Sequence, residues 1–87
     1  MKLKDLRAQI DALDEQLVRI IARRFVLVKL IKQAKKTKGL PVVDKKREKN
    51  ILQKLKTLSH KHVISYSILK NVFNAIFKES KSLQNKQ

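Results

Sequence analysis

Residues 3–38 read LKDLRAQIDALDEQLVRIIARRFVLVKLIKQAKKTK and are followed directly by Gly39-Leu40-Pro41. Apolar side chains recur through this stretch at the a and d positions of a heptad repeat, with one interruption at Arg24. They are Leu3, Leu6, Ile10, Leu13, Leu17, Ile20, Leu27, Ile31 and Ala34. The chain's only glycine and only proline stand where the pattern ends, and a helix is expected to stop there. The pattern therefore predicts one helix over residues 3–38.

A helix of this length is too long for a compact monomer of this size. At 1.5 Å per residue it extends over roughly 54 Å. A compact chain of 87 residues has a radius of gyration of only about 12 Å. We therefore expect the helix to protrude, and we expect another chain to cover its apolar seam.

Two shorter helices are expected after the break. Asp44 is suited to cap the start of a helix that runs to about Ser59, because its side chain can accept from the unpaired N–H groups of the first turn. Residues 59–64 lose the helical period and predict a short connection. Ser65 can then cap a third helix over about residues 65–84, and residues 85–87 are expected to fray.

The expected fold is therefore all-α, with three helices in a single domain of residues 1–87. The helices are expected at about residues 3–38, 44–59 and 65–84. A hydrophobic fraction of 43% is sufficient for a core. One glycine and one proline leave little material for the turns of a many-stranded all-β fold.

The composition limits the kinds of partner and cofactor. Lys and Arg number 22 against 7 Asp and Glu, a net charge of +15, which indicates an anionic partner such as nucleic acid, a membrane surface or a small polyanionic metabolite. The chain has no cysteine, and its two histidines lack the partners of a zinc site, so we expect no metal. A single glycine cannot form a Gly-rich phosphate loop. No signal peptide or membrane span is evident, and we expect a cytoplasmic protein.

Two cations lie on the apolar face of the first helix. Lys35 follows Arg24 by 11 residues, about 1100° of rotation, and so returns to within about 20° of the same face. Val28 and Ile31 lie between them in a stripe about 16 Å long. The two long side chains could converge on one small anion. The alternative is a seam arginine that only snorkels or sets the helix register.

Polar residues also continue the apolar stripe of the third helix. Ser80 and Gln84 follow Phe73 and Phe77 at offsets of 4, 7 and 11 residues, and so lie on the same face. Polar residues are common near helix ends, so position alone favours simple fraying over a binding role.

Two further arginines occupy unusual places. Arg47 stands beside Asp44 and Glu48 at the expected start of the second helix, where a cation makes better sense if an anion binds there. Arg7 precedes Arg24 by 17 residues, about 25 Å along one helix. Arg7 could reach the same small ligand only from a partner chain packed antiparallel. Otherwise it is a solvated arginine near acidic residues.

The sequence resembles the all-helical (type II) chorismate mutase family over essentially its whole length, from Leu3 to Gln84. The resemblance rests on several spaced pieces in the family's order. They are Leu6-Arg7-Ala8-Gln9-Ile10-Asp11-Ala12-Leu13-Asp14, Arg23-Arg24 followed by Ile31 and Lys35, Leu40-Pro41-Val42-Val43-Asp44-Lys45-Lys46-Arg47-Glu48, and Ser80 with Gln84. It implies an intertwined homodimer with two shared active sites. It also implies the Claisen rearrangement of chorismate to prephenate, on the way to phenylalanine and tyrosine, with no cofactor.

The resemblance further implies a role for each polar position. Lys35 and Gln84 would be catalytic, donating to the ether oxygen where negative charge develops. Arg24 and the partner's Arg7 would bind the two carboxylates. Ser80 would donate to a carboxylate.

The start of the second helix would bind the substrate's ring hydroxyl. Glu48 would accept from that hydroxyl, helped by the backbone near Asp44, and Arg47 would orient Glu48. Apolar side chains would form the walls of the pocket and exclude water. The candidates are Val28, Ile31, Ile51, Leu55 and Phe77.

Three other interpretations stay open. A basic helical nucleic-acid-binding dimer would fit the net charge, although the four aromatic residues mostly lie on core stripes and leave no stacking platform. A purely structural helical dimer would explain the seam but not its polar residues. A lyase of the same fold that removes pyruvate from isochorismate would use similar carboxylate contacts.

Overall fold

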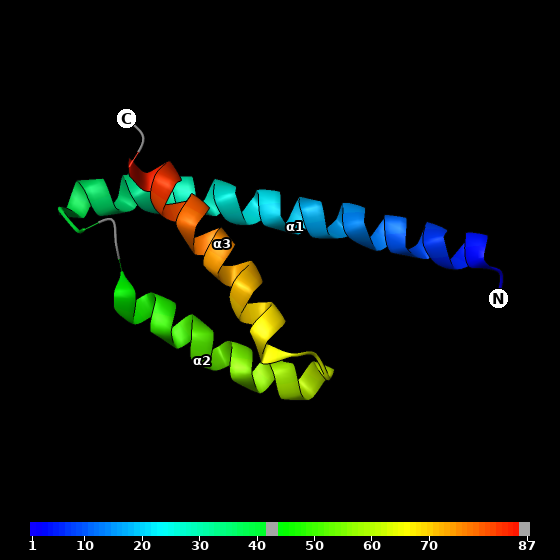
Figure 1. Cartoon of the computed structure of the whole chain (residues 1–87). Coiled ribbons are helices and arrows are strands. Elements are labelled where there is room, and N and C mark those ends of the chain that lie inside the picture. Colours follow the sequence, from blue (N-terminus) through cyan, green and yellow to red (C-terminus); the bar gives the residue numbers. More distant parts are fainter. Residues whose placement is uncertain (42–43, 86–87) are drawn as a thin grey trace.

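The computed structural model describes residues 1–41 and 44–85, and in that part of the chain every regular element is a helix. The helices are α1 (Leu3–Lys38), α2 (Lys45–His62) and α3 (Tyr66–Asn85) (Figure 1). The prediction of an all-α fold with three helices is confirmed. The predicted bounds of the first helix, residues 3–38, are those observed.

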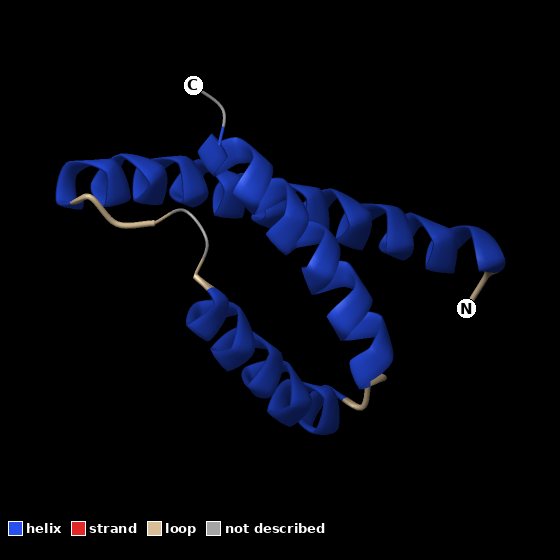
Figure 2. Ribbon diagram, turned by 60° about the vertical axis from the view of Figure 1, so that its left-hand side comes forward, coloured by secondary structure: helices blue, strands red, loops and turns tan. Residues whose placement is uncertain are grey.

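The helices are arranged around α3. This helix packs against both α1 and α2, and it crosses the C-terminal half of α1 while its own N-terminus joins the end of α2 (Figures 1 and 2). The buried apolar core is small and takes one side chain from each helix. These are Val28, Leu55 and Phe77. The C-terminal half of α1 is therefore fixed by tertiary packing.

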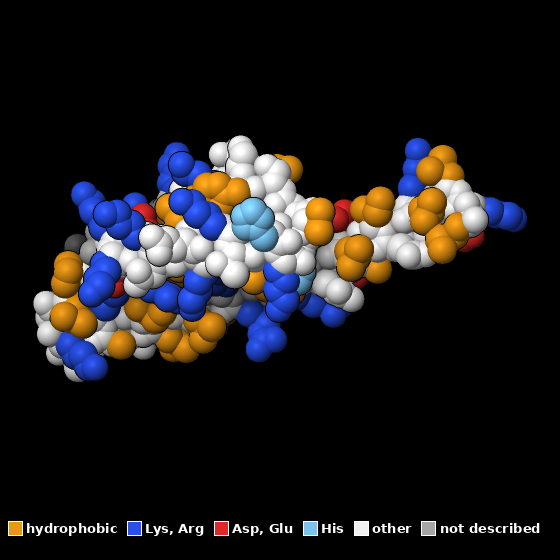
Figure 3. All heavy atoms as spheres, turned by 90° about the horizontal axis from the view of Figure 1, so that it is seen from below, with side chains coloured by type: hydrophobic (Ala, Val, Ile, Leu, Met, Phe, Trp, Pro, Cys, Tyr) orange, Lys and Arg blue, Asp and Glu red, His pale blue; other side chains and the backbone are white. Residues whose placement is uncertain are grey.

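The N-terminal half of α1 extends away from the other helices, as predicted from its length. The radius of gyration is 16.2 Å and the longest dimension is 55 Å, whereas a compact chain of this size has a radius of gyration of about 12 Å. The seam residues on this arm are 43–63% exposed in the single chain: Leu6, Ile10, Leu13, Leu17 and Ile20. Figure 3 shows apolar side chains along the protruding arm.

The turn after α1 is formed at Gly39, where the sequence predicts that the helix ends. Gly39 adopts the left-handed conformation, with φ of 69°, and its N–H donates to the Lys36 carbonyl. The next N–H, that of Leu40, donates to the Lys35 carbonyl at 2.9 Å. These bonds satisfy carbonyls that the last turn leaves unpaired. The loop that follows contains Val42 and Val43, which lie outside the described residues.

The capping prediction for α2 is confirmed, but its predicted end at about Ser59 is wrong. The Asp44 carboxylate accepts from the Arg47 N–H at 2.9 Å. The helix continues to His62, so residues 59–62 are helical and not a connection. The apolar period stops at Ser59 because the last turn, with His60, Lys61 and His62, faces solvent. Basic residues are favourable at the C-terminal end of a helix because of its dipole, so the helix continues through them. The loss of the apolar period at Ser59 therefore did not mark the end of α2.

The third helix begins and ends within one residue of its predicted bounds. The Ser65 carbonyl accepts from the Leu69 N–H at 3.3 Å, so Ser65 stands at the expected capping position. Asn85, which was predicted to fray, is the last residue of the helix. Lys86 and Gln87 lie outside the described residues. No helix of the described part is both long and apolar enough to cross a membrane.

The junction of α2 and α3 contains a strained residue. Val63 ends α2 in the left-handed conformation, with φ of 52° and ψ of 52°, and it is 92% exposed. A left-handed conformation costs an L-residue about 1–2 kcal/mol because of its Cβ, and glycine avoids this cost.

We therefore expect Val63→Gly to raise the free energy of unfolding by about 1 kcal/mol, since little packing is lost. Val63→Ala keeps the Cβ and is the matched control, with a smaller expected gain. Urea unfolding at one fixed protein concentration measures both variants. A glycine variant no more stable than the alanine variant would contradict the expectation.

Candidate active site

A cavity of about 410 Å³ lies between the three helices on the side where α1 ends and α2 begins. All three helices and the residue that caps α2 contribute to its walls. The lining residues are Arg24, Leu27, Val28, Ile31, Lys35, Asp44, Arg47, Glu48, Ile51, Phe77, Ser80, Lys81 and Gln84. A cavity of this size suits a small organic molecule.

Arg24 and Ser80 join α1 to α3 at this cavity. Arg24 Nη1 donates to Ser80 Oγ at 3.1 Å, and Ser80 Oγ donates to the Ile76 carbonyl at 2.8 Å. The buried hydroxyl of Ser80 is thus hydrogen-bonded both as donor and as acceptor. Burial, and secondly the positive charge of Arg47, lower the pKa of the Arg24 guanidinium below its usual value. The site therefore holds cations close together, an arrangement that an anion would stabilise.

Lys35 and Gln84 form a second link between the same two helices. Lys35 Nζ donates to Gln84 Oε1 at 3.1 Å. Both side chains are half-buried and belong to the lining of the cavity. The two residues predicted to donate to one substrate oxygen are therefore within hydrogen-bonding distance of each other.

The N-terminus of α2 supplies the third wall. The cap by Asp44 fixes the first turn, which places Arg47 and Glu48 beside the cavity. The partial positive charge of a helix N-terminus adds to that of the arginine. The lining includes four basic and two acidic side chains, a formal excess of two positive charges. This excess matches a ligand with two carboxylates.

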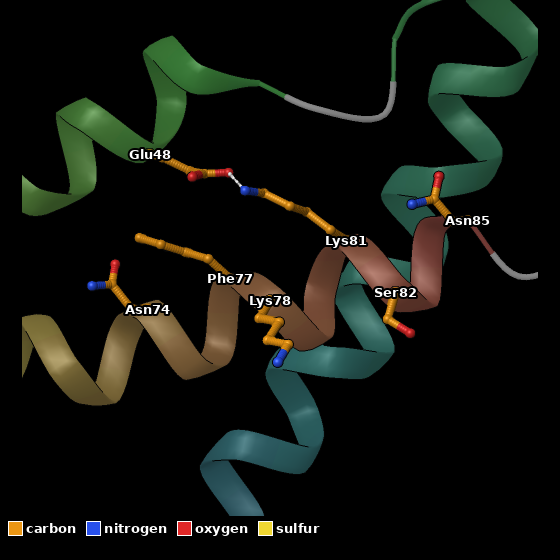
Figure 4. Close-up of a pocket in the computed structure, with 7 residues that line it drawn as sticks. All are labelled: Glu48, Asn74, Phe77, Lys78, Lys81, Ser82 and Asn85. Atoms are coloured by element: carbon orange, nitrogen blue, oxygen red, sulfur yellow. Dashed lines mark ion pairs between the residues drawn. The ribbon is translucent and has the colours of Figure 1, made fainter.

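A second, wider hollow of about 700 Å³ adjoins the cavity. It is lined by Glu48, Asn74, Phe77, Lys78, Lys81, Ser82 and Asn85, so three residues line both spaces (Figure 4). Where the cavity and the wider hollow meet, Lys81 Nζ of α3 and Glu48 Oε2 of α2 form an ion pair at 3.2 Å. The wider hollow contains none of the α1 cations. The smaller cavity is therefore the candidate active site.

The structure brings together most of the residues predicted for the site. Seven of the predicted polar residues line the cavity: Arg24, Lys35, Asp44, Arg47, Glu48, Ser80 and Gln84. Four of the predicted wall residues also do so: Val28, Ile31, Ile51 and Phe77.

Two predicted residues lie elsewhere in the single chain. Leu55 is 3% exposed and belongs to the core, not to the cavity lining, because its position on α2 faces α3. Arg7 is exposed on the protruding arm of α1, as expected from the distance of about 25 Å along the helix from Arg24.

Leu27 and Lys81 also line the cavity, and the sequence patterns do not predict this. Leu27 belongs to the seam of α1, but it also reaches the cavity. Lys81 follows Phe77 by one helical turn, at an offset of four residues, and this spacing could have indicated that it lies near the same face. Among residues 1–41 and 44–85, no three His, Asp or Glu side chains are grouped as metal ligands.

Comparison with known proteins identifies the family. A profile described as chorismate mutase type II matches residues 6–85. A chorismate mutase of Methanocaldococcus jannaschii is 31% identical over 83 residues, which cover 95% of this chain and 84% of that protein. The T-protein of Haemophilus influenzae is 35% identical over 83 residues, covering 95% of this chain and 22% of that protein. A bifunctional chorismate mutase/prephenate dehydratase of Escherichia coli K12 is 35% identical over 75 residues, covering 86% of this chain and 19% of that protein.

The chain thus spans most of the Methanocaldococcus relative and about a fifth of the two longer relatives. The matched range, residues 6–85, includes all the residues that line the cavity. Fold, cavity and sequence similarity agree, and the chain belongs to the type II chorismate mutase family.

Proposed function

We propose that the protein catalyses the rearrangement of chorismate to prephenate in the cavity between its three helices. One observation supports this above all: residues from all three helices converge on one small space with an excess of two positive charges. Chorismate carries two carboxylates, and the cavity matches that charge. We propose that the reaction takes place in the cytoplasm and uses neither a metal nor another cofactor.

The reaction requires the protein to position the substrate and to stabilise the charge that develops on it. The rearrangement is a single pericyclic step, in which the ether C–O bond breaks as a C–C bond forms, and no nucleophile or obligatory proton transfer takes part. The protein has to hold the compact reactive conformer and to stabilise the charge that develops on the ether oxygen. Arg24 and Ser80, whose side chains are hydrogen-bonded at 3.1 Å, are the proposed partners of one carboxylate.

Lys35 and Gln84 are the proposed donors to the ether oxygen. Their side chains meet at 3.1 Å across α1 and α3, so a small acceptor in the cavity could receive a hydrogen bond from each. These hydrogen bonds strengthen as negative charge develops on the ether oxygen. They therefore stabilise the transition state more than the bound substrate, and this difference accelerates the reaction. Glu48 is the proposed acceptor for the ring hydroxyl, with Asp44 and Arg47 supporting it from the first turn of α2.

A homodimer is part of the proposal. The seam residues of the α1 arm are exposed in the single chain, and burying apolar area of this kind stabilises by about 25 cal/mol per Å². A second α1 packed antiparallel would cover them. It would also bring the partner's Arg7 toward Arg24, where a second carboxylate needs a cation.

We expect Lys35→Ala to lower kcat by about 100- to 1000-fold, because it removes one donor to the developing charge. Lys36→Ala is the matched control, since Lys36 is the neighbouring residue and does not line the cavity. The loss of chorismate is followed by absorbance, and circular dichroism checks that both variants are folded. Near-normal turnover of the Lys35 variant would remove this residue from the catalytic role.

The shared site is tested by mixing two inactive variants. A hybrid of an Arg7→Ala chain and a Lys35→Ala chain has one site with both native groups. Random reassociation of equal amounts should therefore restore about a quarter of the native sites. The mixture is unfolded and refolded together, and each variant refolded alone is the control. Hybrids that form but stay inactive would contradict a site shared between chains.

The nucleic-acid alternative has a separate test. Neutralisation of phosphates by lysines would give binding that falls steeply with salt. A gel shift at physiological ionic strength, unaffected by added chorismate, would favour this function over the proposed one.

A further inference from the structure

Lys81 is a charged residue of the cavity lining that has no role in the proposed chemistry, although it forms an ion pair with Glu48. Lys81 Nζ lies 3.2 Å from Glu48 Oε2, and the pair connects α3 to the first turns of α2. In Figure 4 the lysine side chain is extended across the space between the helices, with its nitrogen at the glutamate. The pair also separates the candidate active site from the wider hollow, because both residues line both spaces.

Stability does not explain this pair. The Lys81 and Glu48 side chains are 39% and 26% exposed, and a partly exposed ion pair contributes little to stability because solvent screens it. Lys81 also adds a cation to a cavity that already holds Arg24, Lys35 and Arg47. Its presence there is easier to explain by its effect on the Glu48 carboxylate, with which it pairs.

A carboxylate in this cavity has several competing partners. An ionised glutamate only accepts hydrogen bonds, and it offers about four lone-pair sites on two oxygens. Glu48 shares the cavity with the guanidinium group of Arg24, which could pair with both of its oxygens. Lys81 approaches from α3 as a single ammonium group and pairs with Oε2, and a carboxylate paired in this way keeps acceptor capacity for a hydroxyl group.

We propose that Lys81 is a positioning residue, which holds the Glu48 carboxylate in the orientation that accepts the ring hydroxyl of the substrate. This inference rests on the proposed function. Lys81 thereby acts on the substrate through Glu48 and not by binding a substrate carboxylate itself. The substrate keeps its carboxylate contacts when Lys81 is lost, but it spends less time in the reactive conformer.

The first test compares Lys81→Met with the matched control Lys78→Met. Lys78 lies on the same helix and lines the wider hollow, but its side chain points away from Glu48 (Figure 4). We expect Lys81→Met to lower kcat by roughly 10- to 100-fold with little change in KM, because misplacement of a positioning group costs about that much. Lys81→Arg keeps the cation and should recover most of the loss, whereas Lys78→Met should behave as the unaltered chain. A rise in KM at constant kcat would instead assign Lys81 to direct binding and overturn the proposal.

The second test is a double-mutant cycle with Glu48→Gln. If Lys81 acts through Glu48, Lys81→Met should add less than a threefold loss in the Glu48→Gln background, because residues that act as one unit are not additive. If the losses in activity of the two single variants multiply in the double variant, the role of Lys81 is overturned and the proposed function remains intact. An unaltered chain that does not convert chorismate would overturn the proposed function and this assignment with it. Thermal unfolding of each variant shows whether a loss of activity comes from unfolding.

Discussion

The length of α1 is the constraint on which the rest of the structure depends. Its 36 residues continue well beyond the part that α3 covers, so half of the helix presents apolar side chains to solvent. The same length separates Arg7 from Arg24 by about 25 Å. In the proposed dimer a second α1 packed antiparallel accounts for both the exposed seam and the distant arginine. It covers the seam, and it brings its own Arg7 to the Arg24 of the first chain. Folding and completion of the site would then be the same event.

Polar contacts perform two tasks in this small domain. Few apolar side chains are buried, so the hydrogen bonds from Arg24 to Ser80 and from Lys35 to Gln84 help to hold α1 against α3. The same four side chains line the cavity. Donors fixed by their neighbours need little reorganisation when charge develops on a bound molecule, and this preorganisation is the usual source of electrostatic catalysis.

The cluster of cations in the cavity lowers the stability of the ligand-free protein. Burial and the neighbouring Arg47 lower the pKa of Arg24, which means that the charged guanidinium is less favourable there than in water. An arginine stays protonated nonetheless, so the protein keeps a cluster of cations in partial contact with solvent. A dianionic ligand would relieve their repulsion. The cluster thus lowers stability in the absence of a ligand and raises affinity for an anion.

Local sequence determined the helices and much of the site. The heptad spacing and Gly39 fixed α1, Asp44 fixed the start of α2, and rotation by 100° per residue placed Arg24 and Lys35 on one face, because these are properties of one helix alone. The tertiary structure decided which faces of different helices meet. It placed Leu55 in the core and paired Lys81 with Glu48, since each depends on how α2 and α3 pack and not on spacing within one helix. The last turn of α2, up to His62, was not predictable from the apolar period because it faces solvent.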